Sequence, residues 1–251
     1  MTSETMNNID YSQVRSIADE PHWNTFVQRA GGELVAPLIK RQGVKNADYL
    51  FRQAKVIAEL KVLETEFAHS KEMIARVNAL IAKYPGVNLV DAPETLQREI
   101  FLEFKKPLQR IINTANRQIK QTKHELGLSD HHGVLIFVND NFRGLPPPTV
   151  LNLIGHIMSG TSYKSISAII YQTNHYVEMV EVPYVTLLWY PMYSPEAGQE
   201  LATFVNDLGT KWGAFAEEID GPFDFCESRL NVQIDKALVV DGVLRKRRFE
   251  G

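Results

Sequence analysis

The chain of 251 residues has little cysteine, little net charge and no long apolar run. Its single cysteine, Cys226, excludes a disulfide framework and a cysteine-rich zinc site within the chain, and we expect a packed thiol there rather than a nucleophile. No apolar run approaches the length of a membrane span, and residues 1–11 lack the basic and then apolar order of a secretory signal. The sequence therefore predicts a cytoplasmic protein that does not contact a membrane.

The formal net charge of −3 gives no global sign of affinity for nucleic acid, because DNA-coating proteins are usually strongly basic. Positive charge is local instead, since residues 105–123 contain six lysines and arginines and no acid. At 100° per residue, four of these side chains lie within about 80° of one another on a helix. They are Lys106, Arg110, Arg117 and Lys120. We expect this basic helix face to contact phosphates, and an ordinary solvated face is the alternative.

The remaining composition is that of a globular protein, with 44% hydrophobic and 10% aromatic residues. Aromatic side chains bury large apolar areas, and this burial offsets the entropy that is lost when a chain becomes ordered. No internal repeat and no low-complexity linker divides the sequence. We therefore expect a single α/β domain over residues 1–251, with a mixed central sheet flanked by helices.

The first half of the chain is predicted to contain a hairpin between helices. A helical stretch is expected around residues 33–40, and two short strands are expected over residues 48–53 and 55–63. Apolar spacing then predicts a helix over residues 65–84 and a second helix from about residue 91, which Pro107 should kink or end. Residues 64–106 thus form a predicted helical insertion after the hairpin.

The second half of the chain continues the alternation of helices and strands. The periodicity predicts a helix over residues 107–126, a buried strand over 133–138, a helix over 150–158, strands over 167–171 and 184–190, and a helix over 195–218. Near the end, Asp241-Gly242 predicts the tight turn of a hairpin. The basic cluster at residues 245–248 would protect an exposed edge strand or contact DNA, and the two alternatives are equally favoured.

Two acids and a lysine occur where the predicted hairpin can bring them together. Glu59 and Lys61 are two residues apart on one strand, so they share a face at roughly 7 Å between Cα atoms, and Asp48 begins the partner strand. Hydrolysis of a phosphodiester needs a metal that polarises the phosphate and lowers the pKa of water, together with a cationic group for the developing charge. Mg²⁺ usually takes only one or two carboxylates. We therefore expect Asp48 and Glu59 to bind the metal.

These residues carry a resemblance to a known family. The run that ends at Asp48, ten further residues, and the acid-x-lysine Glu59-Leu60-Lys61 resemble the signature of the PD-(D/E)XK, or restriction-endonuclease-like, nuclease superfamily. The chain has Ala47 where the signature has a proline, which shapes the backbone and does not touch the metal. The resemblance covers roughly residues 33–138, and residues beyond 139 match no particular nuclease family.

The resemblance implies a fold, a site and a cofactor. In this superfamily an acid on the preceding helix and a polar residue on the following helix often complete the site, and Glu33 and Gln118 match these positions. The implied catalytic residues are Asp48, Glu59, Lys61, Gln118 and Glu33. The implied cofactor is Mg²⁺, for which Mn²⁺ can substitute, and the implied substrate is nucleic acid, with DNA favoured. A homodimer or a place in a larger complex stays open.

A second acid-x-lysine serves as an internal control for the motif. Glu103-Phe104-Lys105 lies in a helical pattern, where residues two apart point in different directions and cannot share a metal. Two rival interpretations remain beside the active nuclease. One is an inactive module of the same fold that binds nucleic acid or acts as a scaffold subunit, and the other is an unrelated α/β protein whose motif is accidental.

Overall fold

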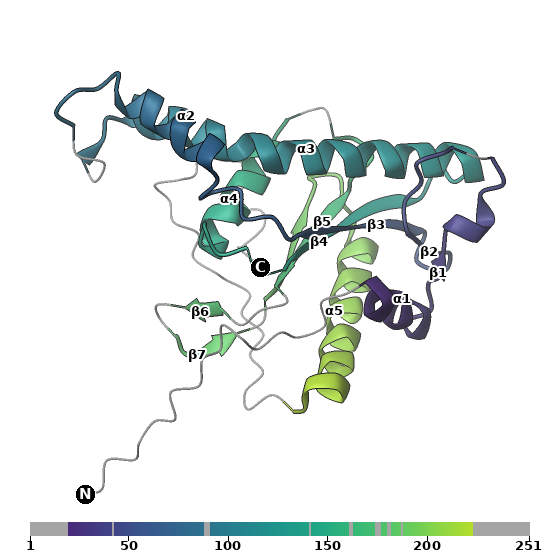
Figure 1. Cartoon of the computed structure of the whole chain (residues 1–251). Coiled ribbons are helices and arrows are strands. Elements are labelled where there is room, and N and C mark those ends of the chain that lie inside the picture. The colour runs from purple at the N-terminus through teal and green to yellow at the C-terminus, as the bar shows by residue number, and fades with distance from the viewer. Residues whose placement is uncertain are drawn as a thin grey trace, which may run out of the picture.

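The computed structural model describes residues 20–41, 43–87, 91–140, 142–160, 163–173, 177–179, 182–186 and 188–222. Its centre is a six-stranded mixed sheet with helices on both faces (Figure 1). The strands of this sheet are β1 (Glu33–Leu34), β2 (Tyr49–Phe51), β3 (Val56–Leu63), β4 (His132–Asn139), β5 (Ala168–Thr173) and β8 (Trp189–Tyr193). The helices are α1 (Glu20–Arg29), η2 (Ala36–Leu38), α2 (Lys71–Ile81), α3 (Glu94–Leu126), α4 (Pro147–Met158) and α5 (Gln199–Asp220). A separate two-stranded sheet pairs β6 (Val177–Met179) with β7 (Val182–Thr186).

The order of the strands follows from how the chain connects them. The strands lie in the order β1-β2-β3-β4-β5-β8. Strands β1, β2 and β3 form antiparallel pairs, and a tight turn joins β2 to β3. Strands β3, β4 and β5 run parallel and are joined through α3 and α4. Parallel neighbours require such long crossovers. The predicted mixed sheet flanked by helices is therefore confirmed.

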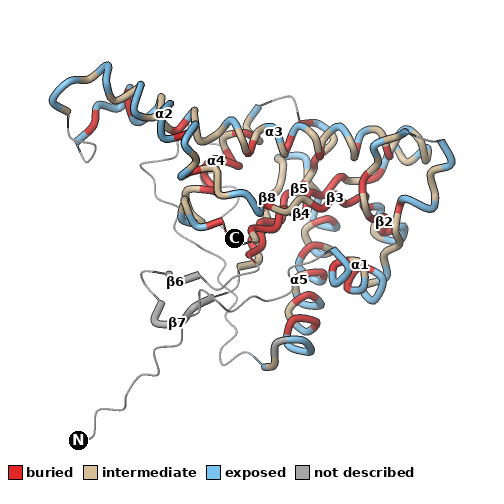
Figure 2. The backbone as a smooth tube through the Cα atoms, in the orientation of Figure 1, coloured by how far each residue is buried: buried red, intermediate tan, exposed pale blue. Residues whose placement is uncertain are grey.

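Each face of the sheet has its own apolar layer. On one face, alternate residues of the central strands pack against α3 and α4, for example Ile57 and Leu135 against Ile112. On the other face, the intervening residues pack against α1 and α5, where Trp23 and Trp212 stack with ring centroids 6.4 Å apart. Figure 2 shows the central strands buried along most of their length. Burial on both faces explains the nearly continuous apolar runs of β4 and β5.

Helix α3 continues through Pro107, so the predicted division into two helices at this proline is wrong. Proline lacks a backbone N–H and crowds the carbonyl of residue 103, yet α3 runs without interruption from Glu94 to Leu126. Packing explains this continuity, because Phe101 and Leu108 are buried on either side of the proline. The helix ends at Gly127, whose φ of 68° lies in the left-handed region that glycine favours. The predicted insertion of residues 64–106 thus comprises α2 and the first part of α3.

Two further predicted elements are wrong. The helix expected around residues 33–40 is instead the edge strand β1 followed by the three-residue η2, because Glu33 and Leu34 pair with β2 and Pro37 lies in the tight turn. The strand expected over residues 184–190 is divided between two sheets: β7 ends at Thr186 and β8 begins at Trp189. The apolar spacing continues across the point where the chain leaves one sheet and enters the other, so the sequence predicted a single strand.

The hairpin, the helices around residues 150–158 and 195–218, and the strands around residues 133–138 and 167–171 are confirmed within a few residues. Among the described helices, none is long and apolar enough to cross a membrane. Cys226 and the hairpin predicted around Asp241-Gly242 lie outside the described residues.

Candidate active site

The β2–β3 hairpin brings the two predicted metal ligands together. Tyr49 pairs with Ala58, so Asp48, which precedes Tyr49, lies beside Glu59, which follows Ala58. The turn is tight: the N–H of Lys55 donates to the carbonyl of Arg52 over 3.2 Å, and Lys55 has a φ of 51°. This arrangement confirms the predicted hairpin and places Glu59 on a strand.

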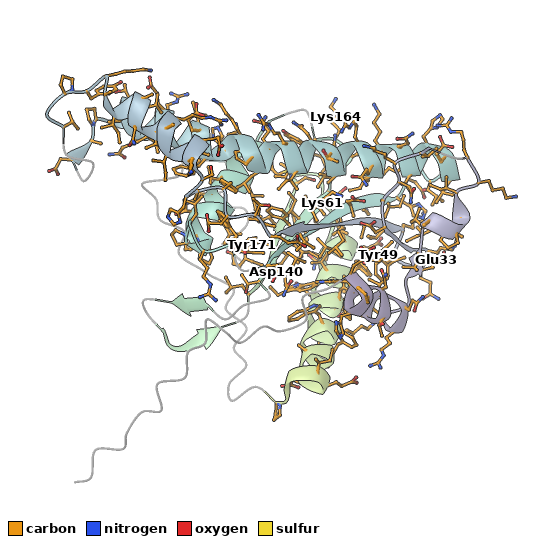
Figure 3. All side chains as sticks on the ribbon, in the orientation of Figure 1. Glu33, Tyr49, Lys61, Asp140, Lys164 and Tyr171 are labelled. Carbon is orange, nitrogen blue, oxygen red and sulfur yellow. The ribbon has the colours of Figure 1, made fainter. Side chains whose placement is uncertain are left out.

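The alternation of β3 sets the side of the sheet on which the site lies. Ile57 and Leu63 pack in the same apolar layer as α3, and Glu59 and Lys61 share their face because side chains two apart in a strand point the same way. Figure 3 shows Lys61 on the side of β3 toward α3 and Tyr49 on the side toward α1. The candidate site therefore lies between the hairpin and α3.

Each side chain of the site has a defined partner. Lys61 Nζ donates to Glu59 Oε1, while Asp48 Oδ2 accepts the backbone N–H of Leu60 at 2.8 Å. Glu59 has no exposed surface, whereas the Lys61 side chain is 26% exposed. The carboxyl groups of Glu59 and Asp48 also hydrogen-bond to each other, which requires a proton on one of them. Among the described residues no N–H group reaches the buried Glu59 Oε2.

Burial and crowding raise the pKa of both acids. Burial is the largest cause of the rise of the Glu59 pKa to about 8; the nearby Asp48 charge adds to it, and Lys61 opposes it. Burial likewise raises the pKa of Asp48, against the lowering effects of the Leu60 N–H and Lys61. Two carboxyl groups this close cannot both ionise cheaply unless a proton or a cation lies between them. A bound cation would replace that proton.

The residues present fit a magnesium ion. Among the described residues no three histidine, cysteine, aspartate or glutamate side chains gather as a ready metal cage. Mg²⁺ does not require one, because it usually takes one or two carboxylates and completes its octahedron with water and substrate oxygens. Asp48 and Glu59 supply this pair, and a bound ion would take the place of the proton that their two carboxyl groups share.

The two supporting residues named from the resemblance have other immediate partners. Gln118, on α3, donates from Nε2 to the carbonyl of Asn46 at 2.9 Å, two residues before Asp48. Glu33 lies on the edge strand β1 rather than on a helix, and its carboxylate pairs with Arg52 (Figure 3). Gln118 therefore contacts the segment that carries Asp48, whereas Glu33 is held in a separate ion pair.

Sequence reasoning missed two residues near the site. Glu20, the first residue of α1, raises the pKa of Asp48 through its charge, so it is the acid on the preceding helix that lies within electrostatic reach. A signal for α1 was present, because Trp23, Phe26 and Val27 follow Glu20 at helical spacing. Thr122, on α3, accepts the N–H of Ala47 at 2.7 Å. Local patterns gave no signal for this contact, since 75 residues separate its partners.

The basic face of α3 points away from the sheet. Arg110, Arg117 and Lys120 are exposed, whereas the buried residues of the helix lie on the opposite side. No carboxylate pairs with these three side chains among the described residues, whereas Lys106 pairs with Glu103. Lys164, which the sequence analysis did not single out, also lies at the outer side of α3 (Figure 3). The helix body, about 10 Å across, thus separates this basic face from the sheet.

The second acid-x-lysine, Glu103-Phe104-Lys105, is helical as predicted. Glu103 and Lys105 both lie within α3, and Glu103 pairs with Lys106 and Arg76 on the helical surface. The acid-x-lysine of β3 is therefore the one whose two side chains share a face.

In comparisons with known proteins, no family model, no curated protein and no solved structure matches the chain.

The raised pKa of Glu59 predicts a pH-dependent stability. A folded-state pKa of about 8 against an ordinary value of 4.5 means that the folded, metal-free protein keeps a proton that the unfolded chain releases. The stability gained from this retained proton is complete below the ordinary pKa of 4.5, and it is lost as the pH rises through the folded-state pKa of about 8. We expect Glu59→Gln to flatten this pH dependence and to raise the melting temperature above about pH 8. Thermal melts across this range in chelator measure the effect, and a slope equal to that of the wild type would contradict it.

Proposed function

We propose that the protein is a metal-dependent nuclease that hydrolyses phosphodiester bonds through Asp48, Glu59 and Lys61. The supporting observation is the pair of crowded carboxyl groups, one of them fully buried and with its pKa raised to about 8, beside a lysine on the same strand face. A surface acid and lysine on an ordinary strand would not combine full burial with a second carboxyl group that is close enough to share a proton. This combination is typical of a cation site.

The order of the elements supports the same proposal. Helix α1, the β2–β3 hairpin, helix α3 and the parallel strand β4 follow one another as the resemblance to the PD-(D/E)XK superfamily implies. The insertion of α2 and the first part of α3 lengthens the crossover from β3 to β4 and leaves their pairing intact. Asp48, Glu59 and Lys61 lie at the β2–β3 hairpin and Gln118 on α3, as the resemblance implies, whereas Glu33 lies on the edge strand β1.

The three side chains have distinct proposed roles. Asp48 and Glu59 hold Mg²⁺, or Mn²⁺ in its place, through carboxylate oxygens. The ion, when bound, polarises the phosphate and lowers the pKa of water. Lys61 neutralises Glu59 in the resting site through its hydrogen bond. Its partly exposed side chain also allows the ammonium group to orient the attacking water or to stabilise charge on the phosphate as it builds.

We further propose that the substrate is nucleic acid, with DNA favoured, and that phosphates lie along the exposed basic face of α3. The double variant Arg117→Gln with Lys120→Gln should then lower the slope of log affinity against log salt concentration by about one to two units. The reason is that binding releases fewer counterions from the nucleic acid when fewer phosphates are contacted. The matched control combines Lys55→Gln and Lys83→Gln, which remove exposed lysines paired with Asp130 and Glu99. An unchanged slope in the first variant assigns the basic face to ordinary solvation.

An inactive module that binds nucleic acid is the second candidate function. The observation that favours it is the separation of the basic face from the site: phosphates bound on the outer side of α3 would be remote from Asp48 and Glu59. The full burial of Glu59 points the same way, because a reacting phosphate must approach past Asp48 and Lys61, which are only partly exposed.

One assay distinguishes the two candidates. Purified protein is incubated with linear and closed circular DNA, with single-stranded DNA and with RNA, in Mg²⁺, in Mn²⁺ or in chelator. The nuclease proposal expects cleavage that requires the metal and that Glu59→Gln abolishes, and cutting of closed circles would show endonuclease action. Binding of nucleic acid without cleavage under every condition would favour the inactive module.

A further inference from the structure

We propose that Thr122 is a positioning residue that holds Asp48 in place from helix α3. The proposal concerns the segment Asn46-Ala47, which leads into β2 and crosses to α3. The N–H of Ala47 donates to Thr122 Oγ1 at 2.7 Å, and the carbonyl of Asn46 accepts from Gln118 Nε2 at 2.9 Å. Gln118 and Thr122 are one helical turn apart, so both polar groups of the single peptide that joins Asn46 to Ala47 are bound by neighbouring positions of one rigid helix.

The hydroxyl of Thr122 stands where packing alone would favour an apolar side chain. Thr122 has no exposed surface, and it shares the buried side of α3 with Ala115 and Ile119. Its partner Ala47 is also fully buried, so the Ala47 N–H has no access to water. A buried amide that finds no acceptor destabilises the fold, because it loses its hydrogen bond to water and gains none in return. The Thr122 hydroxyl thus fixes where the Asn46-Ala47 segment crosses α3, in addition to filling the buried side of the helix.

The effect passes to Asp48 through a single peptide bond. The next residue after Ala47 is Asp48, whose own N–H donates to Ala58 at 3.2 Å and whose carbonyl accepts from Val35 at 2.8 Å. The backbone of Asp48 is thus bound by the two neighbouring segments, and the peptide before it is bound by α3. In this position the Asp48 side chain reaches β3, where Oδ2 accepts the N–H of Leu60. That contact places the carboxylate beside Glu59. Thr122 therefore acts on the site through Asp48 and touches no reacting group.

The catalytic consequence rests on the proposed function, but the positioning itself can be measured without metal or substrate. Exchange of the Leu60 amide proton reports the position of the Asp48 carboxylate, because Asp48 Oδ2 is its acceptor. In Thr122→Val, which keeps the shape and loses the acceptor, we expect faster exchange at Leu60 and Ala47 while other amides of the sheet keep their protection. Thr122→Ser restores an acceptor and should keep the wild-type pattern.

Metal binding gives the second readout. Loss of a supporting hydrogen bond behind a metal ligand typically weakens affinity or activity by about 10 to 100-fold, and we expect this range for Mn²⁺ binding to Thr122→Val in calorimetry. The matched control is Thr114→Val, because Thr114 lies on the same helix and its hydroxyl donates to the carbonyl of Arg110 within that helix. This control and Thr122→Ser should bind Mn²⁺ like the wild type.

The possible outcomes separate this inference from the proposed function. Wild-type exchange at Leu60 in a folded Thr122→Val would overturn the positioning role, as would a uniform loss of protection across the sheet, which indicates a purely structural role. If Thr122→Val does not fold, Thr122→Ala decides the same question by the same amides. A wild type that binds no metal would reject the proposed function, and the exchange experiment would still decide the role of Thr122.

Discussion

Glu59→Gln and Asp48→Asn should each abolish metal-dependent cleavage and weaken Mg²⁺ or Mn²⁺ binding below detection. Each variant keeps the shape of the side chain and removes one of the two carboxylates that, among the described residues, meet at the site. An amide neither carries the charge nor replaces the buried Glu59 Oε2 as an ionised ligand. Binding of nucleic acid, if it depends on the basic face of α3, should persist or improve as negative charge is removed. Calorimetric titration with metal and a cleavage assay measure both effects.

The matched control for these variants is Glu33→Gln. Glu33 is an acid on the same sheet, but it pairs with Arg52 at the edge strand, so its loss should leave metal affinity and cleavage close to those of the wild type. A metal-binding defect of Glu33→Gln as large as that of Glu59→Gln would move the metal site toward the edge of the sheet. Full metal affinity in Glu59→Gln would reject the metal site proposed here.

Lys61→Ala should lower the cleavage rate by about two orders of magnitude or more, the usual effect of losing one group that stabilises the transition state. A second effect is expected at neutral pH. Lys61 is the hydrogen-bond partner of Glu59 and opposes the rise of its pKa, so its removal favours protonated Glu59 and weakens metal binding by competition with the proton. Saturating metal at alkaline pH should restore binding and leave the loss of rate.

This pH dependence separates a role in chemistry from a role in metal binding. If Lys61→Ala regains the wild-type rate once metal saturates, Lys61 serves only to balance the charge of Glu59. If its rate equals that of the wild type at every pH, the catalytic assignment is wrong. Lys105→Ala is the control for the second acid-x-lysine, and it should leave the rate unchanged because Glu103 and Lys105 lie on a helix.

The local features of the site were predictable because they depend on short stretches of chain. Strand alternation has a period of two residues, so Glu59 and Lys61 had to share a face once β3 formed, and a short hairpin had to return Asp48 to their neighbourhood. The same local reasoning identified the second acid-x-lysine as helical, and α3 confirms it. Burial of the strands on both faces was likewise visible in the apolar run of β4.

The errors arose where local preference and tertiary packing disagree. Apolar spacing around residues 33–40 suits a helix, but edge pairing with β2 makes Glu33 part of a strand. Pro107 disfavours a helix interior, but the buried residues on either side keep α3 continuous. In both cases contacts between distant segments outweigh a preference that is worth at most a few kcal/mol.

The sequence by itself determined the chemistry that is available: two carboxylates, a lysine on the same strand face, and a cationic side of one helix. Only the tertiary structure decided how these parts are related. It buried Glu59, brought Glu20 near Asp48, turned the basic face of α3 away from the sheet, and joined Ala47 to Thr122. The physical reason is that hydrogen bonding, desolvation and charge coupling act through space. Partners such as Ala47 and Thr122, 75 positions apart, therefore meet only in the folded chain.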